Sequence, residues 1–446
     1  MRVDVVVMGA GLAGLACARD LMAAGVDVVV LEARERTGGR VEGARLDDGR
    51  LVQVGGEVVG TVHLAYRQLA AELGLELVPS YTDVDGDSYY DLREGVRRGE
   101  SWLSAADLDG LDRLTTECAR LARDVDPADP WSAPDAERLD RLSLHDLAVS
   151  LGVTRTGVRR LDLASRYTGM STTHRYSVLA HLRATAAVGG HDPGDYSVWE
   201  NLKVDGGSSV LVGALTEVVA DRIRLGTPVH AVHVGSPCRV DLADGETIEA
   251  DAVVCAVPNG PRHTIAITGL SDARLRSLQR QGSAAASKAV VGLHRAVWED
   301  VGCNGQILSE RETGGFWVQG GAVLSSLNGD ELPDELVAMP ESEASRRLLG
   351  ALERVVGPVG SPQVLWRHWG HDPWSLGYVA DWSPGDLTDV GPLHGTHEPP
   401  FYVAGSDHWA SGYMEGAVAT GRRAAAAVVG DATAHPTYPA SRFGQG

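Results

Sequence analysis

The hydrophobic pattern at the start of the chain predicts a strand, a tight turn, a helix and a second strand. Residues 5–8 form a short run of β-branched and apolar side chains, and residues 9–14 read GAGLAG. Apolar positions then recur at helical spacing over residues 15–22, and a glycine follows as a stop signal. A buried type of strand follows at residues 26–31. The chain therefore opens with a β-α-β unit.

The turn in this unit carries a dinucleotide-binding fingerprint. Gly9, Gly11 and Gly14 lie between a strand and a helix, and Glu32 ends the second strand, 18 residues after Gly14. The glycines let the backbone approach a pyrophosphate at the positive end of the helix, and the glutamate accepts hydrogen bonds from ribose hydroxyls. An acid at this position disfavours a 2′-phosphate and therefore NADP. The alternative is a glycine-rich tight turn in some other β-α unit.

Further along the chain, the apolar spacing predicts helices outside this unit. Residues 107–125 and 139–151 have helical spacing and are separated by the proline-containing stretch 126–130. Residues 333–356 carry another helical pattern, and the tail at 432–446 is short and polar. A chain that combines β-α units with these helices is of the α/β class.

Length and composition exclude several kinds of protein. A chain of 446 residues favours two domains. Hydrophobic residues make up 43% and charged residues 22% of the chain. No stretch approaches the roughly 18 consecutive apolar residues of a membrane-spanning helix, which predicts a soluble protein. The net charge of −20 repels polyanions, so no nucleic acid is expected as a partner.

Cysteine usage and the chain ends favour a cytoplasmic location. The five cysteines form no CxxC pair and their number is odd, which is typical of free thiols in a reducing compartment. Asp4 interrupts the first apolar run, so no signal peptide is expected, and no apolar helix that could anchor the chain in a membrane follows Gly430. His63, His371 and His408 form no metal-ligand pattern, so no metal site is expected.

Later stretches indicate which dinucleotide is bound. Residues 33–40 read ARERTGGR and residues 55–57 read GGE. Residues 204–208 read VDGGS, and the most specific stretches, 401–407 and 409–417, read FYVAGSD and WASGYMEGA. With these motifs the chain resembles the flavin-dependent amine oxidase family, whose second motif is a glutamate followed shortly by R-x-G-G-R. The resemblance recurs over most of the chain.

The resemblance implies a fold of two domains. One is a Rossmann-like FAD-binding domain of the two-dinucleotide-binding-domain flavoprotein type, and the other is an inserted α+β substrate domain. The FAD-binding domain is expected to be discontinuous, over residues 1–77, 203–283 and 377–431. The substrate domain is expected over residues 78–202 and 284–376.

The resemblance also implies FAD as the cofactor, without a covalent bond to the protein. Some members attach the flavin through a cysteine where this chain has Gly377, and glycine cannot form that bond. A helix starting at Met414 is expected to point its N-terminal amides at the flavin O2, where about half a positive charge stabilises the reduced ring. Asp407 occupies the family's position for the ribityl chain, with a turn or N-cap role as the alternative. The expected cofactor-binding residues are Gly9, Gly11, Gly14, Glu32, Ala33, Arg34, Gly39, Arg40, Gly55, Gly56, Glu57, Val229, Gly405, Asp407 and Met414.

Three residues are expected to carry the chemistry. Tyr413 matches the tyrosine of the family's W-x-G-Y-M-E-G stretch, although this chain has one extra residue after the tryptophan, and Tyr378 matches the second cage aromatic. Together they would flank the amine nitrogen in an apolar slot, the alternative being two half-buried tyrosines without a catalytic role. Lys288 matches a lysine that hydrogen-bonds a water next to the flavin N5 and assists the reaction with oxygen. An exposed, solvated lysine is the alternative, but Lys288 and Lys203 are the only lysines among 40 basic residues, and a desolvated lysine can lose its proton whereas arginine cannot.

The sequence leaves two roles open for Glu57. It would either bind the distal ammonium of a diamine or cap the following turn, and the structural role is favoured. Val58 stands where several members carry a bulky residue, which leaves room near the cage. Trp199, Phe316 and Trp317 are candidates for the cavity wall or for plain core.

These features predict an FAD-dependent amine oxidase. Hydride would pass from the α C–H of a primary or secondary amine to flavin N5, the imine would be hydrolysed to a carbonyl, and oxygen would become hydrogen peroxide. One alternative is L-amino acid oxidation, for which Arg67, Arg183 and Arg295 are present but lie outside any recognisable carboxylate motif. The others are a biosynthetic amine dehydrogenase on the same scaffold and a non-catalytic binding protein. The expected partners are a small amine and oxygen, and a homodimer stays open.

Overall fold

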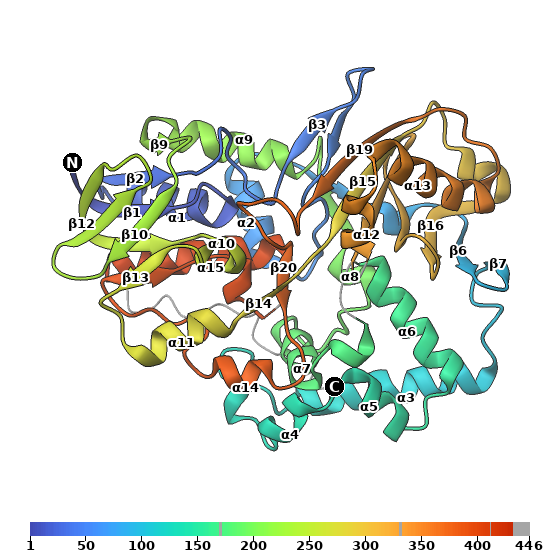
Figure 1. Cartoon of the computed structure of the whole chain (residues 1–446). Coiled ribbons are helices and arrows are strands. Elements are labelled where there is room, and N and C mark those ends of the chain that lie inside the picture. Colours follow the sequence, from blue (N-terminus) through green and yellow to red (C-terminus); the bar gives the residue numbers. More distant parts are fainter. Residues whose placement is uncertain (169–171, 330–331, 411, 431–446) are drawn as a thin grey trace.

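The computed structural model describes residues 1–168, 172–329, 332–410 and 412–430 (Figure 1). The chain opens with the expected β-α-β unit, which consists of β1 (Arg2–Met8), α1 (Leu12–Ala23) and β2 (Val28–Leu31). The two strands are parallel, with Val5 beside Val28 and Met8 beside Leu31. Parallel neighbours need a crossover connection, and α1 provides it.

An eight-stranded sheet carries the glycine turn. Its order is β13, β10, β11, β12, β1, β2 and β9, and β21 also pairs with β12. Strands β2, β1, β12 and β21 run parallel, so their carboxyl ends meet at one edge, where α1 begins. The other strands of this sheet are β9 (Ile223–Arg224), β10 (Val229–His233), β11 (Cys238–Leu242), β12 (Thr247–Cys255), β13 (Ala266–Thr268) and β21 (Phe401–Val403).

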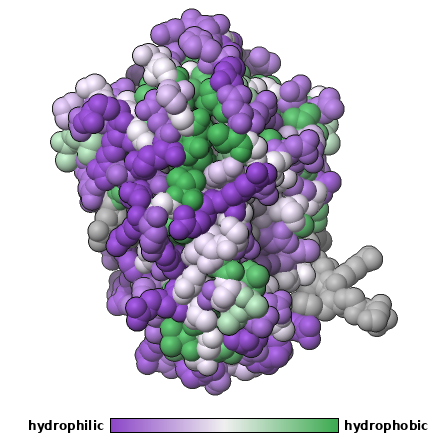
Figure 2. All heavy atoms as spheres, turned by 90° about the vertical axis from the view of Figure 1, so that its right-hand side faces the viewer, coloured by the Kyte–Doolittle hydropathy of each residue, from purple (hydrophilic) through white to green (hydrophobic). Residues whose placement is uncertain are grey.

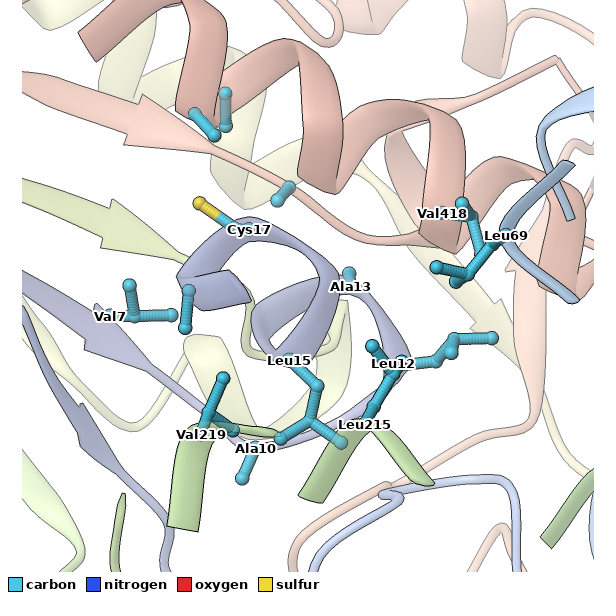
Figure 3. Close-up of a cluster of buried hydrophobic side chains, with 14 of the residues drawn as sticks. Val7, Ala10, Leu12, Ala13, Leu15, Cys17, Leu69, Leu215, Val219 and Val418 are labelled. Carbon is cyan, nitrogen blue, oxygen red and sulfur yellow. The ribbon is translucent and has the colours of Figure 1, made fainter. Parts of the chain in front are cut away.

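Helices α9 (Ser208–Val219) and α15 (Met414–Val428) pack against α1 and fix its position. Figure 3 shows Leu15 of α1 near Leu215 and Val219 of α9, and it shows Val418 of α15 near Leu69 of the neighbouring helix α2 (Leu64–Glu72). All of these side chains are fully buried. Each such side chain contributes about 1.5–3 kcal/mol through burial, which holds the first turn of α1 at the sheet edge.

A second sheet of seven strands forms the other half of the molecule, on the right of Figure 1. Its order is β19, β15, β18, β17, β16, β6 and β7. The strands are β6 (Asp87–Leu92), β7 (Gly95–Arg98), β15 (Ser287–Gly292), β16 (Cys303–Ser309), β17 (Gly315–Gly320), β18 (Val323–Asn328) and β19 (Gln363–His368). Every residue of β15 is buried, which places Lys288 inside the protein and not on an exposed strand.

A group of helices lies below this sheet in Figure 1. It comprises α3 (Ala105–Ala122), α4 (Ala136–Arg141), α5 (Leu144–Ser150), α6 (Arg155–Tyr167), α7 (Val178–Ala187) and α8 (Tyr196–Trp199). Residues 139–151 do not form one helix, because Ser143 and Asp146 make a capping box that starts α5 anew. Residues 333–356 likewise divide into α12 (Leu332–Ala338) and α13 (Glu341–Val356), since Pro340 has no N–H to continue a helix.

Two-stranded ribbons lie where the sequence predicts that the chain passes between domains. One pairs β5 (Leu77–Pro79) with β8 (Leu202–Val204), and the other pairs β14 (Gly282–Ala284) with β20 (Val379–Asp381). The division into two domains stays a prediction. The remaining elements are the ribbon of β3 (Gly43–Arg45) and β4 (Leu51–Gln53), with helices α2 (Leu64–Glu72), α10 (Asn259–Arg262), α11 (Asp272–Arg280) and α14 (Asp386–Val390).

The surface hydropathy and the described helices bear on whether a segment could span a membrane. On the face seen in Figure 2 hydrophilic residues predominate, and hydrophobic residues gather in a band above the centre and in a second group near the bottom. Within the described ranges, no helix combines the length and the hydropathy that crossing a bilayer requires.

Candidate functional site

One cavity of about 320 Å³ is lined by residues of both large sheets. Cavities that hold small organic ligands measure about 300–1,000 Å³. Among the predicted site residues, only Gly14 and Asp407 are absent from its wall. The others line it: Gly9, Gly11, Glu32, Ala33, Arg34, Gly39, Arg40, Gly55, Gly56, Glu57, Val229, Lys288, Tyr378, Gly405, Tyr413 and Met414.

The glycine turn forms one end of this cavity. Gly9 adopts a φ of +97°, which favours glycine. A Cβ on Gly14 would lie 1.9 Å from the carbonyl oxygen of Gly9, so Gly14 closes the turn behind the cavity wall. Gly11 is the N-cap of α1 without a side-chain cap, and Leu12 and Ala13 of the first helical turn also line the cavity. The amides of that turn therefore fit a pyrophosphate.

Glu32 lies at the end of β2 and is only 4% exposed. Its carboxylate accepts hydrogen bonds from the backbone N–H of Ala10 at 2.7 Å and of Arg34 at 2.9 Å. A carboxylate has about four acceptor positions, so two stay available for ribose hydroxyls. Val229 lines the same part of the cavity. This end of the cavity therefore fits the adenosine half of FAD.

Arg40 connects the glycine-rich motif to one of the predicted cage residues. Its guanidinium donates to the backbone carbonyl of Tyr378 at 2.9 Å and to the hydroxyl of Ser406 at 2.9 Å. It also forms an ion pair with Asp407 at 2.8 Å. Asp407 is 2% exposed and accepts the backbone N–H of Asn259 at 2.9 Å. The structure thus places Asp407 behind Arg40, where it orients the arginine.

Helix α15 begins at the cavity wall. Tyr413 is its N-cap and has no side-chain cap bond, while Met414 and Ala417 line the cavity. The Glu415 carboxylate turns away and accepts the backbone N–H groups of Ala65 and Tyr66, at 2.9 and 2.7 Å. The positive end of the α15 dipole therefore faces the cavity, where it would stabilise the negative charge of a reduced flavin.

The residues present fit FAD without a covalent bond. All five cysteines lie in the described part of the chain and are buried, and none of them lines the cavity. The described cavity wall also contains no histidine. Gly377 has a φ of +147°, and a Cβ on it would lie 2.5 Å from the Cβ of Ser283, so a cysteine does not fit at that position.

Lys288 and Glu57 form a buried ion pair in the cavity wall. The Lys288 Nζ lies 2.7 Å from the Glu57 Oε2 and also donates to the carbonyl of Gly55 at 2.8 Å. The Glu57 carboxylate accepts three more hydrogen bonds, from Trp317, Gln319 and Ser325. The Glu57 carboxylate is therefore held by four side chains, and its contact with a distal ammonium or with the following turn stays a prediction.

The pairing also changes the expectation for Lys288. The sequence predicts a lysine that sheds its proton when desolvated, whereas the structure gives it a carboxylate partner. An ammonium has three donors, and two of them are used by Glu57 and Gly55. The third is available to a water or a ligand in the cavity.

The two predicted cage tyrosines line the cavity and are held at their hydroxyls. Tyr378 donates to the carbonyl of Thr168 at 2.7 Å, and Tyr413 donates to the Glu200 carboxylate at 2.7 Å. The Tyr413 ring lies 4.9 Å from the ring of His63 and 5.2 Å from that of Trp199. Burial raises the pKa of both tyrosines well above its usual value, so both rings stay neutral.

His63 supports this arrangement as a neutral ring. Burial lowers its pKa to about 3, and its Nδ1 accepts the backbone N–H of Gly60 at 2.8 Å. No group of three or more potential metal ligands occurs among the residues that the structure describes.

Sequence reasoning missed several residues of the cavity wall. The most consequential is Glu200, at the end of α8, whose carboxylate accepts hydrogen bonds from Tyr413 and from Tyr81. In the sequence Glu200 only follows a tryptophan, and an acid next to a tryptophan is not a motif that indicates a function. Of the proposed wall aromatics, Trp317 lines the cavity, whereas Trp199 and Phe316 are fully buried elsewhere. Missed aromatics of the wall are Tyr167, Tyr176, Trp369, Trp374 and Trp382.

The arginines considered for L-amino acid oxidation do not line the cavity. Arg67 donates to the carbonyl of Thr61, Arg183 donates to the carbonyl of Pro127, and Arg295 pairs with Asp300 at the surface. The arginines of the described wall are Arg34, paired with Asp372, and Arg40. No arginine is therefore placed to hold a substrate carboxylate within the described wall.

Comparison with known proteins points to one family. The model described as flavin containing amine oxidoreductase matches residues 12–429. Putrescine oxidase from Kocuria rosea is 30% identical over 468 residues, which cover 96% of this chain and 95% of that protein. Flavin-containing amine oxidase B from Sus scrofa is 27% identical, over 95% of this chain and 85% of that protein.

Solved structures agree with the sequence comparison. A structure of putrescine oxidase bound to putrescine has a TM-score of 0.87 at 26% identity and covers 96% of this chain and 99% of its own. Cyclohexylamine oxidase from Brevibacterium oxydans IH-35A has a TM-score of 0.82 at 25% identity, over 96% of this chain and 98% of its own. The fold of the described chain is thus that of these two amine oxidases.

Proposed function

This chain belongs to the flavin-containing amine oxidoreductase family, and on that premise we propose that it passes electrons from an amine to molecular oxygen, with hydrogen peroxide as by-product. The protein is an FAD-dependent enzyme that oxidises amines. When bound, FAD supplies an acceptor for the hydride of the amine's α C–H bond.

One observation carries this proposal. A single cavity joins the glycine turn and Glu32 at one end to Lys288, Tyr378 and Tyr413 at the other. A cofactor held by the first set therefore presents its reactive ring to the second set. This continuity also argues against the non-catalytic scaffold, since a binding protein needs no such connection.

Tyr378 and Tyr413 are proposed to form the two walls beside the amine nitrogen. Both are neutral, and their hydroxyls are fixed by Thr168 and Glu200. Between two such rings an uncharged amine is favoured over an ammonium, because the slot offers little solvation to the charge. The neutral nitrogen has the lone pair that hydride loss from the neighbouring carbon requires.

Lys288 is proposed to assist the reaction with oxygen. Its ammonium is fixed by Glu57 and by the carbonyl of Gly55, and one N–H is left for the cavity. A fixed positive charge stabilises the negative charge that forms as oxygen accepts electrons.

The proposed substrate is a primary or secondary amine of small size. The described wall is rich in aromatic side chains and holds no arginine that could bind a carboxylate, which disfavours amino acids. We place the enzyme in the cytoplasm because all five of its thiols are free, which is typical of a reducing compartment. A homodimer stays compatible with these features.

A peroxide-coupled screen tests the proposal. Purified FAD-loaded enzyme is mixed with primary amines, polyamines, N-methylated amines and L-amino acids, each with and without catalase. The proposal expects a catalase-sensitive signal with at least one amine and none with the amino acids. Turnover with a dye acceptor but no peroxide in air would instead identify a dehydrogenase.

A further inference from the structure

Glu200 places a carboxylate in the cavity wall next to a proposed cage residue. Its Oε1 accepts the hydroxyl of Tyr413 at 2.7 Å, and its Oε2 accepts the hydroxyl of Tyr81. Each oxygen thus uses one acceptor position on a tyrosine and keeps another. Glu200 lines the cavity, so a ligand beside Tyr413 also lies beside this carboxylate.

The charges around Glu200 distinguish it from the other acids of the site. Glu57 is paired with Lys288, and Asp407 is paired with Arg40. Glu32 is held by backbone N–H groups at the other end of the cavity. Among the described residues, no Lys or Arg lies within ion-pair distance of Glu200, and its hydrogen-bond partners are neutral hydroxyls. A cation that enters the cavity finds in Glu200 an acid without a positive partner.

At neutral pH most alkylamines are protonated, whereas the reaction requires the neutral amine. A primary alkylamine has a pKa near that of a lysine side chain, about 10.4, so at pH 7 about one molecule in 2,500 is uncharged. The ammonium has no lone pair on nitrogen, and it must lose a proton before its C–H bond can deliver hydride. A group inside the cavity that takes this proton makes the abundant charged form usable.

We propose that Glu200 receives the proton of the incoming substrate ammonium, an inference that rests on the amine oxidase function proposed above. In this step an N–H bond of the ammonium breaks and an O–H bond forms on the Glu200 carboxylate. No electrons are transferred, and the charged pair becomes a neutral amine beside a neutral carboxylic acid. The neutral amine then occupies the slot next to Tyr413, while Glu200 returns its proton to solvent when the product leaves.

The surroundings of Glu200 suit a proton acceptor. Burial raises its pKa above the usual value and the nearby Glu57 carboxylate adds to the rise, whereas the hydrogen bonds from Tyr81 and Tyr413 and the positive charge of Lys288 lower it. A raised pKa strengthens the carboxylate as a base, and the two hydroxyls donate hydrogen bonds that favour its charged form. Tyr81 is absent from the cavity wall, so it acts on the carboxylate without touching the substrate.

The test compares the pH dependence of kcat/KM for the wild-type holoenzyme and Glu200→Gln, with putrescine and with benzylamine as probes. Between pH 7 and the pKa of the amine, the wild type is expected to stay nearly flat, because it uses the ammonium. The variant is expected to rise about tenfold per pH unit, because it depends on the neutral amine alone. A loss that is the same at every pH would overturn the proposal, since a structural role of Glu200 predicts that result.

Tyr81→Phe provides a second variant that leaves the carboxylate in place. It removes a hydrogen bond that lowers the Glu200 pKa, so the acid limb of kcat/KM should move to higher pH. An unmoved limb would contradict the proposal even if Glu200→Gln failed to fold. Failure of the amine oxidase function itself would look different, because the wild-type enzyme would then oxidise neither these probes nor any other amine of the peroxide-coupled screen.

Discussion

The buried ion pair between Lys288 and Glu57 predicts a large coupling between the two side chains. They are 5% and 4% exposed and their charged atoms lie 2.7 Å apart. Removing one partner of a buried pair costs about 3–5 kcal/mol, because the other charge is left without compensation. We expect Lys288→Met to lose about 3 kcal/mol of stability, at the lower end of this range. The reason is that Glu57 keeps the hydrogen bonds from Trp317, Gln319 and Ser325. The double variant, Lys288→Met combined with Glu57→Gln, has no unpaired charge at this place.

The free energy of unfolding of the double variant should therefore fall by about 3 kcal/mol less than the summed losses of the two single variants. The assay is urea unfolding followed by tryptophan fluorescence, at free FAD concentrations that saturate every variant equally, because cofactor binding adds to stability. Arg2 and Asp251 serve as the matched control. They form an exposed pair at 3.0 Å, with 64% and 61% exposure, for which the coupling should stay below about 1 kcal/mol. Additive losses at Lys288 and Glu57, within about 0.5 kcal/mol, would refute the reasoning.

Three further variants test individual roles. Lys288→Met should slow reoxidation of the reduced enzyme by oxygen about 100-fold in stopped flow, because the fixed charge is lost, while the Kd for FAD changes far less; unchanged oxygen reactivity contradicts the assignment. Tyr413→Ala should lower the rate of anaerobic reduction by amine about 10- to 100-fold, because one wall of the slot is missing, and reduction at the parent rate would remove Tyr413 from the cage. Gly14→Ala should destabilise the glycine turn by about 1–3 kcal/mol and release FAD on gel filtration, because its Cβ would lie 1.9 Å from the Gly9 carbonyl oxygen; a variant that keeps its flavin and its Tm would show that the turn can relax.

The local features of the fold were predictable from the sequence. The β-branched run before Gly9 and the spacing from Gly14 to Glu32 belong to a single stretch, in which neighbouring residues determine the structure. Broken helices were harder to predict. The apolar period continues through Ser143 and Pro340, whereas capping and the missing proline N–H end the helices there.

Partners across the cavity were not predictable, because they depend on packing between distant segments. Lys288 and Glu57 are 231 residues apart in the sequence. No local sequence pattern predicts that Lys288 on β15 lies next to the Glu57 carboxylate. The role of Asp407 depends in the same way on Arg40, at the other end of the chain. Glu200 belongs to no motif, and only the structure shows its contacts with Tyr81 and Tyr413.

Anaerobic reduction of the purified protein by an amine tests the central claim most directly. The protein should be yellow, and denaturation with acid should release the flavin into the supernatant. Under nitrogen, addition of a substrate amine should bleach the visible flavin absorbance, and admission of air should restore it and yield peroxide. A colourless protein that does not bind FAD, or a yellow one that no amine bleaches, would contradict the account.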